Sequence, residues 1–552
     1  MEYVGTSRLD SKASTGIVYD DLRITPHPEN DAELAGTRSG PVSAQIPFIP
    51  AASAQQIRLA AGGIATGFAG LTHRDQRLAG TEIYANTQFS TEPPDQGLAV
   101  GNGFVLQTVN SALAIFDESG TLRQGPTALN QFLHLKPEVN RSTGAYGDLT
   151  SDPRAYYDAQ LQRWFLTVAA VATDTKSGQF AAPTRILIAV SQSNDPTGDW
   201  RIYSIDTTND GREGCPCFAD QPLIGADAYG FFISTNAFSL REGFAGAQIY
   251  AISKQLLASG AAPAVAHWNS PHVAGGLAFS IQPSFGGLAS AENEPSAGVE
   301  YMMSIADIRN VLDNRVAVWA MSNTESLNDA SPAPKLHSVI VKTESFGMPP
   351  DALQRFGETE LGSLTGEKSQ RIETNDHRLQ QTFFAGGTLW SALTTMVAFP
   401  KDPSAYAGIA YFAIRPTLGA AGRLTAQVVR QGYVAVSGND LLYPAIAAHE
   451  NGNAAVAFTV AGADYFPSAA FTLVDEKGAG DVQIVAAGAS AQDGFSGYAF
   501  FGGSGSGRSG DYSAATVDAN GAIWSAVEFI PSGARTLLAN WGTYIAKIAA
   551  GY

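Results

Sequence analysis

The chain has 552 residues, of which 57 are glycine and only 15% are charged, and its formal net charge is −17. This length exceeds one ordinary core and predicts several domains or one repeat architecture. The acidity excludes nucleic acid as a partner, because no basic stripe is available to neutralise phosphates.

The first part of the chain differs in composition from the rest. Residues 1–75 contain clusters of Pro, Ser, Ala and Gly without a sustained period, so we predict an extended N-terminal arm. The stretch "LAAGGIATGFAGL" is too short and too rich in glycine to span a bilayer, and no transmembrane segment is predicted. The opening "MEYVGTSRLD" is not a signal peptide, and we expect a secreted or cell-surface protein from which that peptide has been removed.

Residues 76–552 contain seven stretches that share one pattern. Each has an Asp or Pro, a short apolar strand, a polar turn that usually contains Gly, and a second β-rich strand. The copies begin at Asp95, Asp152, Asp220, Pro283, Asp376, Pro444 and Asp511. Each interval leaves room for two further strands. The pattern therefore predicts an all-β chain that forms a seven-bladed β-propeller, with each hairpin as the inner pair of a blade.

Two local features lie outside this pattern. Cys215 and Cys217, in "GCPCF", lack the partners of a structural zinc site, so we expect either an adjacent disulfide or two idle thiols in a surface loop. The C-terminal "TLLANWGTYIAKI" is predicted to be the last outer strand of the ring. Glycine-rich "GGSGSGRSG", just before Asp511, precedes a strand and is predicted to be a mobile loop over the channel mouth.

Several of these stretches together resemble a known family. "GFAGLTHRDQRLAG", "EPPDQGLAVGNGFVLQTVN", "AVSQSNDPTGDW", "DQPLIGADAYGFFISTNAF" and "SGDYSAATVD" look like secreted bacterial proteins of unassigned function that are described as sialidase-like or BNR-type propellers. The resemblance runs from about Gly67 to Tyr544. It implies a β-propeller fold and export, but fold does not give function.

The sialidase comparison can be made residue by residue. "SNDPTGDW" matches the Asp-box of such propellers at Ser193, Asp195 and Trp200, with one extra residue before Gly198 and no Thr before the Trp. Such a box is a folding device on an outer turn, where the Asp caps backbone N–H groups. The Arg-Ile-Pro signature of sialidases is absent, so the resemblance does not imply sialidase activity.

Five copies place an Asp at the entry to the inner strand, where a propeller would gather them around its central channel. Converging carboxylates suit Ca²⁺, and the predicted metal ligands are Asp95, Asp152 and Asp220. Alternatively, two acids held close separate their pKa values and can act as acid and base; the predicted catalytic residues are Asp220, Asp376 and Asp511. In a third alternative each Asp only caps the turn that enters its strand.

Other side chains near these acids differ from copy to copy. Arg154, Arg378 and Tyr512 are the predicted ligand-binding residues. Strand alternation places Arg154 with Asp152 and Arg378 with Asp376, and it turns His377 away from the channel. We therefore predict a packed or surface histidine there, and not a general base.

No nucleophile elbow, H-E-x-x-H, Walker loop or dinucleotide fingerprint occurs in the sequence, and no organic cofactor is expected. We expect a propeller that binds a glycan or a small anionic ligand at the channel mouth and is stabilised by Ca²⁺. The alternative is a carbohydrate-active enzyme, a glycoside hydrolase or polysaccharide lyase, that uses the channel-mouth carboxylates.

Overall fold

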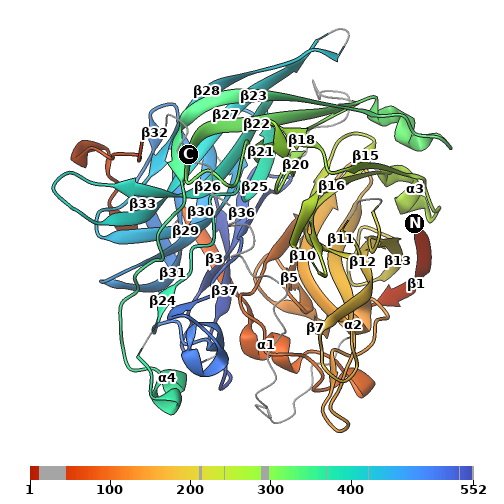
Figure 1. Ribbon diagram of the computed structural model, residues 1–552, viewed down its shortest axis with the longest axis horizontal. Helices are drawn as coiled ribbons and strands as arrows, with labels where there is room; N and C mark the ends of the chain where they lie inside the picture. Colours follow the sequence, from red (N-terminus) through yellow and green to blue (C-terminus); the bar gives the residue numbers. More distant parts are fainter. Residues whose placement is uncertain are drawn as a thin grey trace.

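The structure is a computed structural model that describes residues 1–10, 45–61, 63–210, 214–241, 243–286, 298–368, 370–419, 422–533 and 535–549 (Figure 1). Nearly all of its regular elements are strands. The helices are short: α1 (His73–Leu78), α2 (Leu129–Phe132), α3 (Lys254–Ser259) and α4 (Glu360–Thr365). None of the helices in these ranges is long or apolar enough to cross a membrane.

The described strands form successive antiparallel units of four, each of which runs from an inner to an outer strand. The first unit is β4 (Gly97–Gly101), β5 (Phe104–Val109), β6 (Ala112–Asp117) and β7 (Leu122–Ala128). The second is β10 (Leu149–Asp158), β11 (Arg163–Thr173), β12 (Phe180–Ser191) and β13 (Asp199–Asp206). The third is β14 (Cys217–Ala226), β15 (Gly230–Ser239), β16 (Gly243–Ser253) and β17 (Val265–Asn269).

The remaining units follow in chain order. The fourth is β20 (Gln282–Gly286), β21 (Val299–Ile305), β22 (Leu312–Ser322) and β23 (Lys335–Gly347). The fifth is β25 (Gln381–Ala385), β26 (Thr388–Ala398), β27 (Ala405–Leu418) and β28 (Leu424–Val434). The sixth is β29 (Asn439–Ala448), β30 (Ala454–Gly462), β31 (Tyr465–Asp475) and β33 (Val482–Ala486), and the last is β35 (Ala514–Val517), β36 (Ile523–Phe529), β37 (Gly542–Ile548) and β3 (Ala65–Thr72).

The inner strands of these units contact one another in a closed order. The order is β4, β10, β14, β20, β25, β29, β35 and back to β4. A closed ring of antiparallel sheets is a β-propeller, so the predicted fold class is confirmed. Apolar side chains of neighbouring sheets pack between them, and the tryptophans of the second strands, Trp164, Trp390 and Trp524, are buried there.

The ring is closed by strands from opposite parts of the chain. β3 pairs antiparallel with β37, from Ala65 opposite Ile548 to Thr72 opposite Gly542. The prediction that "TLLANWGTYIAKI" is an outer strand is therefore wrong: β37 is the third strand, and β3 covers its free edge. Gln107 of the first unit reinforces the closure, because its side chain accepts from the Leu71 backbone and donates to Thr543.

Two strands of the predicted arm are added at outer edges of the ring (Figure 1). β1 (Glu2–Arg8) adds a fifth strand beside β13, and β2 (Ile57–Leu59) pairs parallel with β33. Such pairing covers strand edges that would otherwise be free to bind another chain. β3 lies within the predicted bounds of the arm, residues 1–75, but it is the outer strand of the last unit. Residues 11–44 and 62 of the predicted arm lie outside the described residues.

Cys215 and Cys217 form a disulfide, which is one of the two alternatives predicted from their spacing. Cys217 begins β14 and is buried against Ala237 and Ala245. The bond closes a loop of only three residues, and the entropy that a disulfide removes from the unfolded chain grows with the length of that loop.

We therefore expect the double substitution Cys215→Ser/Cys217→Ser to lower the free energy of unfolding by only about 1–2 kcal/mol. Urea denaturation of the oxidised protein and of the variant measures this difference. A loss above about 4.7 kcal/mol, the value for a loop of roughly 100 residues, would show that the bond stabilises more of the structure than its own turn.

Candidate functional site

The inner strands begin on one face of the ring, which we call the entry face. Within each inner strand, or up to six residues before it, lies a non-glycine residue with positive φ: Asp95 (38°), Asp152 (54°), Gln221 (47°), Ser280 (44°), Asn375 (54°), Tyr443 (53°) and Asp511 (29°). In β10, β14 and β29 this residue lies at a break in the strand register. Such backbone is uncommon and is found at functional sites, where the surrounding structure maintains it.

Three of these residues place buried carboxylates close enough to influence one another. Burial, together with the charges of Asp511 and Asp152, raises the pKa of Asp95 well above its ordinary value. Burial and the charge of Asp511 likewise raise the pKa of Asp152. The Asp220 side chain acts in the opposite direction, because its hydrogen bond lowers the pKa of Asp152 and so offsets part of this rise. Asp95 and Asp152 therefore hold protons more strongly than free aspartates do.

An aromatic ring and a guanidinium group complete this group of acids. The Tyr512 hydroxyl donates to Oδ1 of Asp152 at 3.2 Å, and burial raises the pKa of Tyr512 well above its ordinary value. The guanidinium carbon of Arg154 lies 3.4 Å from the centre of the Tyr512 ring, a cation–π contact. Asp511 forms an ion pair with Arg508 at 2.5 Å. We call Asp95, Asp152, Asp220, Asp511, Arg154 and Tyr512 the entrance cluster.

Asp376 and Arg378 form a separate pair beside the cluster. Oδ2 of Asp376 accepts from Nη2 of Arg378 at 2.6 Å, and Oδ1 accepts from the Arg378 backbone N–H at 2.8 Å. Although burial would raise it, the charge and hydrogen bonds of Arg378 hold the pKa of Asp376 below its ordinary value. Nη1 of Arg378 donates to Gln221 of another unit at 3.0 Å. Asp376 thus caps its own turn and forms an ion pair with Arg378. These bonds engage the carboxylate and the guanidinium that were predicted to act on a ligand.

The predicted site residues accordingly divide into two groups, the entrance cluster and the Asp376–Arg378 pair. No group of three or more His, Cys, Asp or Glu side chains is arranged to hold a metal ion among the described residues. The calcium site at Asp95, Asp152 and Asp220 stays a prediction. His377 is buried, its ring lies 5.7 Å from that of Phe346, and burial lowers its pKa, so it is packed as predicted.

Sequence reasoning missed the residues that support the cluster. Asn110 accepts from the Ser151 hydroxyl at 3.3 Å and donates to the Pro93 carbonyl. Arg508 lies within the glycine-rich stretch that we predicted to be a mobile loop. Its position three residues before Asp511 is the only sequence signal for the ion pair. Gln221 precedes a proline, as Asp152 does. This shared X-Pro sequence could have indicated that Gln221 occupies the equivalent position in its unit.

The interior of the channel is narrow. A cavity of about 20 Å³ lies between the inner strands of several units, lined in part by Gln96, Arg154, Gln282 and Gln381. This space suits about one water molecule. The Gln96 amide is buried beside it and has no hydrogen-bond partner among the described residues. This cavity is therefore sized for water, and a larger ligand would have to bind outside it.

Two connections that lead into inner strands pack together on the entry face. They are residues 351–376, which contain α4, and residues 491–511; we call them the entry lobe. β24 (Arg371–Ile372) pairs parallel with β34 (Ser506–Gly507), so the glycine-rich stretch is held by a strand pair and the mobile-loop prediction is not supported.

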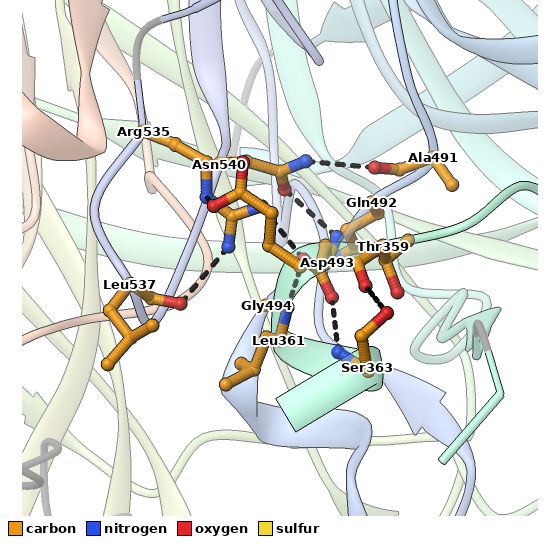
Figure 2. Close-up of polar contacts among 12 residues, drawn as sticks. Thr359, Leu361, Ser363, Ala491, Gln492, Asp493, Gly494, Arg535, Leu537 and Asn540 are labelled. Carbon is orange, nitrogen blue, oxygen red and sulfur yellow. Dashed lines mark hydrogen bonds and ion pairs between the residues drawn. The ribbon is translucent and has the colours of Figure 1, made fainter. Parts of the chain in front are cut away.

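Asp493 fixes the base of this lobe (Figure 2). Its carboxylate accepts from the Leu361 backbone at 2.8 Å, from Nη1 of Arg535 at 2.8 Å and from the Tyr498 hydroxyl at 2.6 Å. The first of these bonds satisfies an N–H group at the start of α4. The lobe is therefore held in place by a buried charge with several donors.

The outer turn identified as a degenerate Asp-box has the expected structural role. Asp195 accepts from the backbone N–H of Thr197 at 2.9 Å in the turn between β12 and β13. Nε1 of Trp200 donates to the Pro196 carbonyl at 2.8 Å. The side chains of Asp195 and Trp200 thus hydrogen-bond within their own turn, between β12 and β13.

Comparison with known proteins adds little to these observations. No family model matches the chain, and no curated protein matches it. Among solved structures, the N-terminal domain of Nup159 is 7% identical, with 91% of this chain and 99% of that chain covered, at a TM-score of 0.34. A Trypanosoma rangeli sialidase in complex with sialic acid is 10% identical, with 90% and 60% covered, at 0.32. A GH43 endo-arabinanase from Bacillus licheniformis is 11% identical, with 60% and 96% covered, at 0.25. Values this low assign neither a family nor an activity.

Proposed function

We propose that the protein is a secreted or cell-surface β-propeller that binds a glycan on its entry face, over the entrance cluster, whose side chains are each at most 8% exposed. The observation that carries the proposal is the convergence of acids from several units, beside Arg154 and Tyr512, on strained backbone. Groups with strongly perturbed pKa values and strained backbone are concentrated at functional sites.

The polar groups of this region suit a polyhydroxyl ligand. Asp95 and Asp152 hold protons more strongly than usual, and Arg378 and Arg508 are paired with Asp376 and Asp511. Arg154 lies against the Tyr512 ring and forms no ion pair with another described residue. A glycan presents hydroxyl groups that both donate and accept, and an acidic sugar would add a carboxylate for Arg154.

A carbohydrate-active enzyme is the second candidate. A carboxyl group with a raised pKa, such as Asp152, beside an ion-paired carboxylate, such as Asp511, is the arrangement that glycosidases use for acid catalysis. Binding stands first because the channel cavity of about 20 Å³ is far smaller than the roughly 300–1,000 Å³ of ligand pockets.

The test uses Asp152→Asn, which keeps an oxygen to accept the Tyr512 hydroxyl and removes the acid. Against a panel of oligosaccharides measured by calorimetry, we expect the variant to bind at least about tenfold more weakly, or ~1.4 kcal/mol. Asn520→Ala, in the turn between β35 and β36 on the opposite face, is the control and should stay within about twofold.

The outcomes separate the candidates. Release of reducing sugar that Asp152→Asn abolishes would establish the enzyme, and weaker binding by Asn520→Ala alone would place the ligand on the opposite face. Thermal unfolding with and without excess chelator tests the predicted calcium site, since a cation bound only to the folded state raises the melting temperature. An unchanged melting temperature would mean that no such cation stabilises the protein.

A further inference from the structure

An open pocket lies on the entry lobe, apart from the entrance cluster. Its volume is about 700 Å³, and it is lined by residues 356–359 with Ser363, Glu367 and Lys368. This volume falls within the range of small-molecule sites, unlike that of the channel cavity.

The walls of this pocket are held in place by the lobe. The Glu367 carboxylate accepts the backbone N–H groups of Ala499 at 2.8 Å and Phe500 at 3.1 Å, so it joins the two connections of the lobe. The Thr359 hydroxyl lies 3.2 Å from the Tyr498 hydroxyl, which in turn donates to buried Asp493. Figure 2 shows Thr359 and Ser363 beside Asp493. A ligand would therefore meet a largely preformed site.

Large apolar side chains are exposed around it. Phe356 lines the pocket and is 55% exposed, and Leu364 of α4 is 68% exposed. Phe500 is 65% exposed, and its backbone N–H donates to the Glu367 carboxylate. Exposed apolar groups that gather on one feature mark binding sites. A flat aromatic ring suits the C–H face of a sugar ring, which is apolar although the ring edge carries hydroxyls.

The polar side chains of the pocket restrict the ligand class. Three charged side chains line the pocket: Glu358, Glu367 and Lys368. Glu367 already accepts two backbone N–H groups, whereas Glu358 and Lys368 form no hydrogen bond or ion pair with another described residue. An anionic ligand is repelled by the two acids and a cationic ligand by Lys368. A ligand with both donor and acceptor groups and no charge satisfies both.

We propose that this pocket is a second binding site, for a neutral saccharide residue that stacks on Phe356 and hydrogen-bonds Glu358 and Lys368. A basic peptide is the main competing ligand, and Lys368 within the pocket disfavours it. The proposal does not depend on the entrance cluster, because the two sites share no residue. Each can therefore fail while the other stands.

The test measures binding of neutral hexaoses (cellohexaose, xylohexaose, mannohexaose and maltohexaose) by calorimetry, with hexagalacturonate, chitosan hexamer and an arginine-rich peptide as charged arms. At least one neutral hexaose should bind, with an affinity that is insensitive to salt between about 50 and 500 mM, because a ligand without charge is not screened. Phe356→Ala should weaken it at least about tenfold, and Lys368→Met and Glu358→Gln should each weaken it several-fold.

The matched control is Phe48→Ala, which removes another exposed phenylalanine, 61% exposed, beside the end of β26 in the fifth unit. It should leave binding within about twofold of the wild type. Melting curves of both variants check folding. Preferential binding of a charged hexamer or of the peptide, an equal loss with Phe48→Ala, or no hexaose binding would each overturn the proposal. Loss of binding by Asp152→Asn but not by Phe356→Ala would leave only the entrance cluster as a site.

Discussion

Replacing Arg378 with methionine is expected to lower the free energy of unfolding by about 3–5 kcal/mol, because it leaves the Asp376 carboxylate buried without its cation. Asp376 is 6% exposed and Arg378 is 5% exposed. Nε and Nη2 of Arg378 both donate to this carboxylate, at 2.9 and 2.6 Å. Water cannot replace these donors at such burial, so the charge of Asp376 is left uncompensated or must take up a proton.

A matched pair elsewhere in the chain supplies the control for this prediction. Arg309 pairs with Asp307 at 2.9 Å with the same spacing of two residues, but 49% of the Arg309 side chain is exposed. Arg309→Met should therefore cost less than about 1 kcal/mol. The double variant Asp376→Asn/Arg378→Met should recover part of the loss, as urea denaturation of the four proteins would show. Equal losses for Arg378→Met and Arg309→Met would mean that burial does not govern this ion pair.

The fold was predictable from sequence because strand pattern and turn chemistry recur at regular intervals. The hairpin turns repeat glycine where φ is positive, as at Gly103 (81°) and Gly387 (71°), and the strands between them alternate or are wholly apolar. The closure was not predictable. β3 carries no feature that identifies its partner, and its pairing with β37 joins distant parts of the chain, as the 472-residue separation of Leu71 and Thr543 illustrates.

The site was predictable only in part, for a different reason. Repetition located the acids at the inner-strand entries, and period-two alternation correctly joined Asp376 to Arg378. Sequence did not show which acids face one another, because this depends on left-handed residues that change the direction of the side chains. Asp152 meets Asp220 and Tyr512 for that reason, whereas Asp376 turns back to its own backbone.

Buried glutamates on the entry side predict that stability falls as pH rises. Burial is the main cause that raises the pKa of Glu92 to about 7, of Glu138 to about 8 and of Glu528 to about 8, from an ordinary value of 4.5. Between about pH 4.5 and 8 the folded state therefore binds more protons than the unfolded state, and raising the pH favours unfolding. Their stabilising contribution is fully present below about pH 4.5 and is lost through pH 8.

One buried histidine acts in the opposite direction at lower pH. Burial, with the charges of Arg77 and Arg535, lowers the pKa of His73 to about 3, so the unfolded state binds the extra proton between about pH 6.5 and 3. Above about pH 6.5 this contribution ends and only the acids act. We expect the free energy of unfolding to fall by about 4 kcal/mol between pH 6.5 and 8, at a slope of ~1.4 kcal/mol per proton and pH unit.

Glu138→Gln isolates one of these contributions. Oε2 of Glu138 accepts the Phe89 N–H at 2.7 Å, and a glutamine oxygen can accept the same bond without a titrating proton. The variant should lose about 1.5–2 kcal/mol less than the wild type between pH 6.5 and 8, measured by urea denaturation at each pH. Glu476→Gln, on the surface after β31, is the control and should follow the wild-type profile. A wild-type profile that is flat or rises over this interval would mean that these glutamates are ionised in the folded protein, with their charges compensated by groups other than those described above.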